Sequence, residues 1–295
     1  MSLNTRLFLL LLALGLSAAP LTAQISYGFK TGLNFSRMDG PAETGPDGAA
    51  LETMKNVTGF HIGAAFGYPI TDHYGVRAEL LYSKKGGKYA YEGPAYRFFT
   101  PATGSPILTT GTARYLLNIT QSYIDIPVFG YARFGDFEVQ AGPYVALNIQ
   151  SAAEGSLRYT GAKTTVLGNA VADSEFNLDH NYRKDDIGEG DNTQVLKLTV
   201  DGKTIEMPKT LGAYYDFRED RGRLYNSIDY GLMGGFSYYL SHALYLGVRL
   251  QYGLADLTRT DADVKRSKLG DNNALIFNAD KDRNFTIQAS VGFSF

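Results

Sequence analysis

The sequence has no cysteine, and beyond its first residues it has no long hydrophobic run. Without cysteine no disulfide can hold the chain together outside the cytoplasm, so its stability must come from another source. Without ~20 consecutive apolar residues, no later segment is predicted to cross a membrane as a helix. An excess of one charge is also missing, because 28 Lys and Arg stand against 30 Asp and Glu. This balance gives no indication of a nucleic-acid partner.

The N-terminal residues have the organisation of a secretory signal peptide. Arg6 gives a positive start, an apolar run of ten residues covers 7–16, and a small, turn-prone stretch follows. Ten apolar residues are too few for a membrane anchor. We therefore predict a signal peptide at 1–23, cleaved after Ala23 or, as the alternative, after Ala19.

The end of the chain alternates strictly between apolar and polar residues. The apolar positions are Phe285, Ile287, Ala289, Val291, Phe293 and Phe295. A period of two predicts a strand with one apolar and one polar face. An exposed apolar face of this kind promotes aggregation in water, but it is expected where a barrel contacts lipid. The frequent glycine (33) and tyrosine (21) also suit a barrel, at crowded inner positions and at the membrane interfaces respectively.

Seven further segments share this alternation. The eight predicted strands are 25–37, 56–70, 73–90, 113–134, 136–151, 225–240, 243–257 and 284–295. Three connections are tight turns, around 71–72, 135–136 and 241–242, and four are long, at 38–55, 91–112, 152–224 and 258–283. An even strand count with alternating short and long connections is typical of an outer-membrane barrel. The fourth strand changes phase near Gln121, which predicts a β-bulge there.

We therefore predict an all-β fold, an eight-stranded antiparallel transmembrane up-and-down β-barrel covering 24–295. Its short turns are expected in the periplasm and its long loops outside the cell. A soluble lipocalin-like barrel is the alternative, because the sequence does not say which face of the strands is the outer one.

The 152–224 connection is too long for a bare loop. Residues 195–207 predict a β-hairpin around an Asp201-Gly202 turn, and 157–166 predict a second around Thr160-Gly161. The acidic stretch 173–191 is expected to be solvated and mobile. We interpret the insert as an extracellular β cap that continues the barrel strands.

Six short stretches resemble a bacterial outer-membrane β-barrel domain family called PorT-like. The stretches are 28–36, 78–86, 123–128, 141–145, 251–254 and the closing Phe293-Ser294-Phe295. Together they span the mature chain except its loops. The resemblance implies an eight-stranded barrel and a C-terminal signal, here Phe293 and Phe295, read by the barrel-assembly machinery. It implies no catalytic residues, and the long 152–224 insert departs from the family's minimal pattern.

Seven charged residues fall on the predicted inner face. They are Lys30, Arg77, Glu79, Asp125, Arg133, Glu138 and Arg249. Isolated buried charges cost several kcal/mol, so four cations and three anions should pair. Eight strands leave room for side chains but not for an open pore. We favour a salt-bridged plug over the alternative, a proton or ion path.

The remaining candidates for chemistry are histidines and acidic clusters. The four histidines, His61, His73, His180 and His242, show no spacing that indicates a catalytic triad. Acidic residues at 185–186, 189–191 and 261–263 can in principle bind calcium, but they lack the full EF-hand series, which favours a solvated loop. No cofactor, metal site or catalytic residue is predicted.

We therefore expect a non-enzymatic outer-membrane protein with a structural or binding role through its outer loops. Outer-membrane lipid, the barrel-assembly machinery and an unidentified extracellular ligand or envelope protein are the expected partners. A transport role, as a narrow channel or a protein-secretion accessory, is the first alternative. An enzyme acting on lipid or peptide at the rim is the second.

Overall fold

The computed structural model describes residues 25–295, so the predicted signal peptide at 1–23 lies outside the described residues. The described chain is all β apart from one short 3-10 turn, η1 (Asp271–Asn273). Within it, no helix has the length and apolar character needed to cross a membrane. The strands are β1 (Ser26–Asp39), β2 (Glu52–Lys55), β3 (Val57–Pro69), β4 (Tyr74–Phe99), β5 (Ile107–Phe134), β6 (Phe137–Thr164), β7 (Ser174–Asn181), β8 (Gly190–Val200), β9 (Lys203–Leu211), β10 (Ile228–Tyr239), β11 (Leu244–Gly253) and β12 (Arg283–Ser294).

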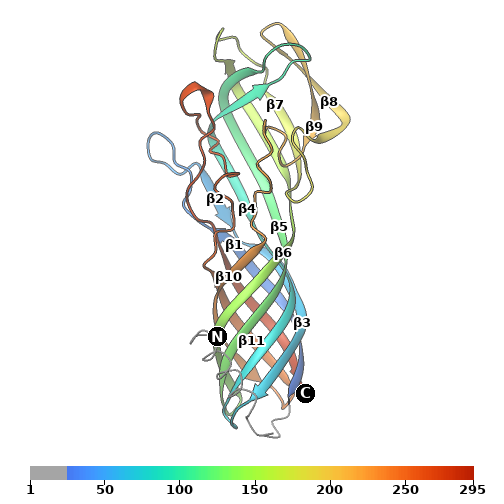
Figure 1. The fold of residues 1–295 in the computed structure, drawn as a ribbon, viewed down its shortest axis with the longest axis vertical. Helices are drawn as coiled ribbons and strands as arrows, with labels where there is room; N and C mark the ends of the chain where they lie inside the picture. Colours follow the sequence, from blue (N-terminus) through green and yellow to red (C-terminus); the bar gives the residue numbers. More distant parts are fainter. Residues whose placement is uncertain (1–24) are drawn as a thin grey trace, which may run out of the picture.

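The twelve strands form one sheet that closes on itself in its lower part (Figure 1). Antiparallel pairings run from β1 through β3, β4, β5, β6, β10, β11 and β12, and β12 pairs with β1 again. We call this closed set of strands the ring. The other four strands lie outside it: β2 pairs with β4, β7 with β6, and β9 with both β7 and β8. The predicted all-β barrel type is thus confirmed, but the sheet holds twelve strands where eight were predicted.

The connections at the two ends of the ring differ in length. Short turns join β3 to β4, β5 to β6 and β10 to β11 at the lower end, near the start of β1 and the end of β12 (Figure 1). At the other end β4, β5 and β6 continue far beyond their neighbours, over 26, 28 and 28 residues. At ~3.3 Å per residue, 28 residues extend about 90 Å, several times the ~30 Å hydrocarbon core of a bilayer.

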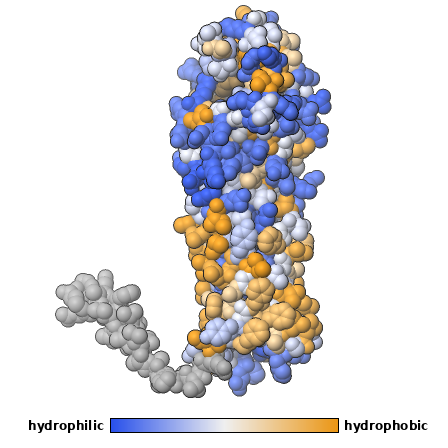
Figure 2. All heavy atoms as spheres, turned by 90° about the vertical axis from the view of Figure 1, so that its right-hand side faces the viewer, coloured by the Kyte–Doolittle hydropathy of each residue, from blue (hydrophilic) through white to orange (hydrophobic). Residues whose placement is uncertain are grey.

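The outside of the ring is apolar. Large hydrophobic side chains point outward from all eight strands and form what we call the belt. On the face shown in Figure 2, hydrophobic residues predominate in the lower half of the molecule and hydrophilic residues in the upper half. Examples from five strands are Phe29, Phe66, Val139, Leu232 and Leu250, which are 44, 46, 51, 57 and 51% exposed. Alternate residues on the same strands point inward, and they include the charged and most of the polar side chains of the ring. This is the arrangement that hydrocarbon outside a barrel requires.

Beyond the belt, the long strands and the long connections build a second structure, which we call the cap: residues 40–56, 87–120, 151–226 and 255–282. Its core is aromatic and aliphatic, with Tyr91, Phe99, Tyr159 and Phe176 all at most 1% exposed. The cap therefore has a packed interior of its own rather than a set of independent loops.

Three local predictions for this region are wrong. The 91–112 connection is mostly strand, with only 100–106 between β4 and β5. Residues 157–164 continue β6 instead of forming a hairpin. The acidic stretch contains β7, whose Phe176 and Leu178 lie in the cap core because they alternate with its charged residues. The predicted hairpin at Asp201-Gly202 is present, with both turn residues at positive φ of 49° and 74°.

The predicted bulge near Gln121 exists, but it lies in the neighbouring strand. Ser122 pairs with Gln150 and Tyr123 with Asn148, so Ile149 is the extra residue and it belongs to β6. Within β5 the odd-numbered residues face inward without interruption. The apparent change of phase in β5 arises because its apolar residues move from the outer face, against lipid, to the inner face, within the cap.

Candidate functional site

Buried ion pairs cross the lumen of the ring. Nearest the tight turns, Arg77 binds Glu138 in a bidentate fashion, with Nη1–Oε1 and Nη2–Oε2 distances of 2.7 and 3.0 Å, and the Tyr239 hydroxyl donates to Glu138 at 3.0 Å. Further in, Arg249 binds Glu79 in the same way at 2.9 and 2.8 Å. Paired, bidentate geometry is what makes charge tolerable in a space closed to water.

Two lysines complete these pairs. The Lys30 Nζ lies 3.5 Å from Glu79 Oε2, so this carboxylate has a cation on two sides. The Lys85 Nζ lies 2.9 Å from Asp125 Oδ2, with both side chains at most 1% exposed. The lumen thus carries paired charges, some between adjacent strands, as in Lys85–Asp125, and some between strands far apart in sequence, as in Arg249–Glu79.

Arg133 differs from the other six predicted interior charges, all of which lie in these lumen pairs. It is half-buried at the last residues of β5, where its Nε donates to the Gly135 carbonyl at 3.3 Å. Its guanidinium stacks on the Tyr239 ring at 3.7 Å. The strand has already reached the turn at this point, so no inner wall remains to enclose the charge, and its assignment to the interior network is wrong.

Sequence reasoning missed two members of the lumen set, Lys85 and Asp229. Asp229 Oδ2 accepts hydrogen bonds from Tyr144 at 3.1 Å and from Asn284 at 2.8 Å. Both residues have the same odd parity as the inward residues already assigned on their strands. Strict extension of the alternation along β4 and β10 therefore identifies them.

Large side chains fill the remaining lumen. Phe129, Tyr123 and Tyr144 are at most 2% exposed, and their rings stack against the lumen cations. At the turn end a cavity of about 10 Å³ lies beside Arg77 and Tyr245, which is the space of a single water molecule. Cavities of 110 to 460 Å³ lie in the cap instead.

Ser290, His61 and Asn34 form a hydrogen-bonded chain that spacing did not indicate. The His61 Nε2 lies 3.0 Å from Ser290 Oγ, and its Nδ1 lies 2.8 Å from Asn34 Oδ1. This is the order of groups in a nucleophile, base and orienting residue. A hydrolase also needs a space about 3 Å from the nucleophile where the reacting atom can sit.

That space is lacking around this chain of side chains. None of the cavities described above is lined by His61 or Ser290. A Cβ on Gly32 would lie 2.8 Å from the His61 ring and 2.0 Å from the Ala289 carbonyl oxygen, so even a methyl group has no room. The Gln288 amide occupies the second face of Asn34 Oδ1, at 3.1 Å. This hydrogen-bonded chain therefore links the neighbouring strands β12, β1 and β3 along the inner wall of the ring.

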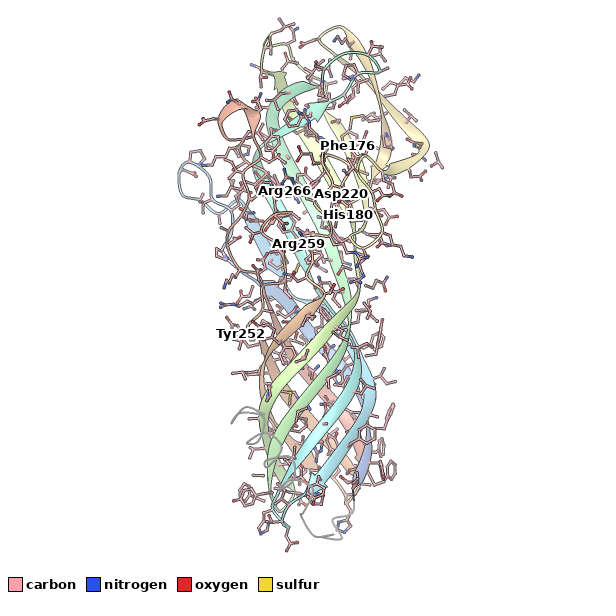
Figure 3. All side chains as sticks on the ribbon, in the orientation of Figure 1. Phe176, His180, Asp220, Tyr252, Arg259 and Arg266 are labelled. Atoms are coloured by element: carbon pink, nitrogen blue, oxygen red, sulfur yellow. The ribbon has the colours of Figure 1, made fainter. Side chains whose placement is uncertain are left out.

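The other three histidines lie apart from it and from one another. His73 and His242 are in the tight turns at the lower end. His180 lies in the cap (Figure 3), where its Nδ1 is 3.0 Å from the Tyr182 hydroxyl and burial lowers its pKa to about 4, so the ring is neutral at pH 7.

Carboxylates of the acidic clusters accept hydrogen bonds from backbone amides of the cap. Asp185 Oδ2 accepts the amide protons of Asn181 and Ala213, both at 2.8 Å, and Asp191 accepts that of Thr193 at 2.9 Å. Among residues 25–295 no group of three or more His, Cys, Asp or Glu side chains is arranged to hold a metal ion.

Two arginines lie inside the cap. The Arg97 side chain is 2% exposed, and its Nη2 lies 2.8 Å from Asp216 Oδ1. Arg266 stacks on the Tyr115 ring at 4.3 Å, and its Nε donates to the Tyr89 hydroxyl at 3.3 Å. Figure 3 shows Arg266 in the middle of the cap, well above Tyr252 on the ring. A cation in an apolar setting marks a place where an anion is stabilised.

Two carboxyl groups at the base of the cap titrate near neutral pH. Burial, followed by the nearby charge of Asp263, raises the pKa of Asp282 to about 7. Burial likewise raises the pKa of Asp263 to about 6. Both line a cavity of about 140 Å³ together with Arg266. Perturbed groups of this kind are frequent at functional sites, though structural networks produce them as well.

The family model described as "Outer membrane protein beta-barrel domain" matches residues 18–259. Among curated proteins, none matches the sequence. Several solved structures have a related shape. Ail, the attachment invasion locus protein of Yersinia pestis, is 8% identical with a TM-score of 0.34, over 92% of this chain and 98% of that chain. Neisserial surface protein A is 10% identical with a TM-score of 0.32, over 91% and 97% of the two chains. OprG from Pseudomonas aeruginosa is 10% identical with a TM-score of 0.32, over 92% and 95%.

Proposed function

The chain belongs to the outer membrane protein beta-barrel domain family, and we propose that it is a non-enzymatic binding protein of the outer membrane whose cap carries the binding surface. Family membership makes the outer membrane its location. In this proposal the ring spans the bilayer with eight strands, the tight turns face the periplasm and the cap stands outside the cell. Assignment to the PorT-like group within these barrels is part of the same proposal.

One observation carries the proposal: the cap has a packed core and cavities, and it stands beyond the apolar belt (Figures 1 and 2). A barrel that only anchors itself needs strands of ~9 to 11 residues. Here β4, β5 and β6 are more than twice as long. Ordering that additional backbone costs conformational entropy, which favours a role that depends on a fixed surface.

The lumen supports a binding role over a channel. Bidentate ion pairs at Arg77 and Arg249 and the stacked rings around them leave no wide path for solutes. Planar-bilayer recordings of the purified protein are expected to show no steady conductance. A stable open level would favour transport instead.

A cap-trimmed variant tests the binding role. It replaces 88–118 and 152–224 by short loops and leaves the ring pairings of β4, β5 and β6 in place. Because the belt and the lumen pairs are retained, the variant should still insert and still change its gel mobility on heating. Full-length and trimmed proteins in lipid nanodiscs are compared on a panel of polysaccharides, peptides and aromatic acids. Binding by the full-length protein alone supports the proposal, whereas equal binding by both, or failure of the trimmed ring to insert, contradicts it.

The predicted partners belong to the same proposal. Phe293 and Phe295 point outward at the lower end of β12, 43 and 79% exposed, where the barrel-assembly machinery and lipid can reach them. Replacing both by alanine is expected to lower the amount of assembled protein in the outer membrane.

A further inference from the structure

A groove of about 130 Å³ opens along the side of the cap. It lies against the end of β4, where Ala95 to Phe98 pair only with β5, and the 216–218 and 264–275 segments cover it. A hydrogen bond of 3.1 Å from the Tyr96 hydroxyl to the Lys265 carbonyl ties the covering segment to the strand. The groove is therefore part of the packed cap and not a gap between loops.

The lining of the groove is strongly cationic. Four cations line it, Arg97, Arg218, Lys265 and Arg266, against a single acid, Asp216. Asp216 is already bound to Arg97 at 2.8 Å, and no other acid lines the groove. Arg266 also borders the 140 Å³ cavity in which Asp263 and Asp282 lie, so Arg218 and Lys265 are the cations without an acid beside them in either cavity lining. Like charges gathered at one partly buried place repel one another, and a bound anion relieves that repulsion.

Arg266 is the cation best placed to meet a ligand. Tyr115 supports its guanidinium from one side, and the Tyr89 hydroxyl accepts a hydrogen bond from its Nε. Its Nη1 and Nη2 atoms have no hydrogen-bond or ion-pair partner within residues 25–295, and they are not among the fully buried polar atoms, so they keep some accessible surface. A stacked guanidinium with two available nitrogens can bind a carboxylate or phosphate through two parallel hydrogen bonds.

Arg97 adds a fixed charge behind this position. Its Nε and Nη1 are buried and have no hydrogen-bond partner in the described chain, and Asp216, its counter-ion, is 43% exposed. The guanidinium instead packs on the Phe176 ring at 4.7 Å. Because Asp216 is partly solvated, it neutralises the positive electrostatic potential of the buried Arg97 only in part. The remaining positive potential favours an anion in the groove.

Apart from Asn273, the rest of the lining is aromatic and aliphatic. Tyr96, Phe98, Tyr115, Phe217, Val264 and Leu275 surround the cations, and Arg218 lies over the Phe98 ring at 3.7 Å. A cavity of roughly 150 Å³ accepts a benzene ring. At about 130 Å³ the groove is close to that size, and its cations lie beside the aromatic rings that line it.

We propose that this groove is a binding site for a small aromatic molecule bearing one anionic group, a carboxylate or a phosphate, with Arg266 as its main ligand-binding residue. The inference rests on the proposed binding role of the cap and names the ligand class for it. The ring of the ligand packs among Phe98, Tyr115 and Phe217, and its anionic group accepts hydrogen bonds from Arg266, with Arg218 and Lys265 at the entrance.

Calorimetric titration of the full-length protein in nanodiscs tests this site with three probes: 3-phenylpropanoate, phenyl phosphate and the uncharged 3-phenylpropanamide. One or both anions should bind, and the better of the two identifies the anionic group. The amide should bind at least about tenfold more weakly, because it offers no charge-assisted hydrogen bond. Arg266→Gln should weaken the anion by at least about tenfold, and Arg266→Lys by less, since it keeps the charge but loses the bidentate geometry.

Matched variants separate the site from a loss of fold. Arg218→Gln changes an exposed side chain that no cap contact depends on except the Phe98 ring, and it should still weaken the anion severalfold. Arg259→Gln removes a cap cation that pairs with Asp261 outside the groove, and it should leave affinity unchanged. Every variant must retain the heat-dependent gel mobility of the wild type.

Two results would overturn the site. The first is that the wild type binds neither anion. The second is that the wild type, Arg266→Gln and Arg218→Gln bind the anion with equal affinity. The binding role itself is judged separately by the cap-trimmed variant. If full-length protein binds other panel members through the cap while these probes do not bind, only the inference about the groove fails.

Discussion

Single residues in the lumen are held by several partners each. Glu79 receives both Arg249 and Lys30, and Glu138 receives both Arg77 and Tyr239. In a space without bulk water, removing one partner leaves the carboxylate buried. The desolvation cost of that carboxylate remains, but part of the electrostatic attraction that offset it is lost. We therefore interpret the lumen pairs as an interdependent set that fixes the relative positions of strands distant in sequence.

The Arg249–Glu79 pair provides a quantitative test. Arg249→Gln should lower the free energy of unfolding by about 3 kcal/mol, because it leaves Glu79 buried with only the more distant Lys30. Reversible urea unfolding in lipid measures this quantity. Arg133→Gln, at the partly exposed turn end, should cost less than about 1 kcal/mol and serves as the control.

A double-mutant cycle completes that test. Glu79→Gln combined with Arg249→Gln should cost less than the sum of the two single changes, because neither charge is then left alone. Additive losses would show that the two side chains act independently.

Ser290 tests the enzymatic alternative. Since none of the cavities described above is lined by Ser290, a fluorophosphonate probe should not label the folded protein. Ser290→Ala should leave lipid-hydrolysis assays unchanged while it lowers stability through the lost hydrogen bond to His61. Labelling at Ser290 in the native protein would restore the hydrolase hypothesis.

At the scale of the strand, alternation predicts which residues share a face but not what that face contacts. In β5, Asp125 and Tyr123 face the lumen and Tyr115 and Leu117 face the cap core, all with the same parity. Outside the same strand, Ile126 meets the belt and Asn118 meets water. In the sequence of β5, the apolar residues change from even to odd positions, which predicts a bulge in this strand. The change instead marks the point where the strand leaves lipid, which contacts its outer face, and enters the cap, where apolar side chains face inward.

The cap could not be predicted for the same reason. Its strands are amphipathic in the ordinary sense of a water-soluble protein, so nothing marks where β4 leaves the membrane and continues as a cap strand. Pairing of β6 with β10 and of β7 with β9 depends on contacts remote in sequence, which local patterns do not contain. The Asp201-Gly202 hairpin was predictable because its turn chemistry is local.

The connection that precedes β12 should respond to pH. Asp282 has a folded-state pKa of about 7, above the ~3.9 of an unfolded aspartate. The folded state therefore holds a proton that the unfolded state has lost, and this contribution to stability is full below pH ~4 and lost as pH rises through about 7. Amides of 256–263 and 278–282 should exchange faster at pH 8 than at pH 5, after correction for intrinsic rates.

Asp282→Asn separates this effect from others. The amide stays neutral at every pH, so the difference in protection between the two pH values should largely vanish. Asp271→Asn, at an exposed position in η1, should retain it. If the wild-type cap is equally protected at both pH values, the buried carboxyl does not set its stability.

At the scale of the whole molecule, the ring has a surface suited to lipid and the cap has a surface suited to water. The ring turns hydrophobic side chains outward and charges inward, and the cap does the reverse (Figure 2). The three longest strands, β4, β5 and β6, run without interruption from the ring into the cap. A surface held in this way can present a binding groove without the ordering cost that a flexible loop incurs on binding.

Single-cysteine spin labelling tests this division of solvents most directly, and the absence of native cysteine makes each label unique. Labels at Leu232 and Phe236 face outward, those at Met233 and Ser237 face the lumen, and one at Val195 lies on the cap. In bilayers the two outward sites should be more accessible to oxygen than to a water-soluble nickel complex, the cap site should show the opposite preference, and the lumen sites should be protected from both. Preferential collision of the nickel complex with labels at Leu232 and Phe236 would contradict the account.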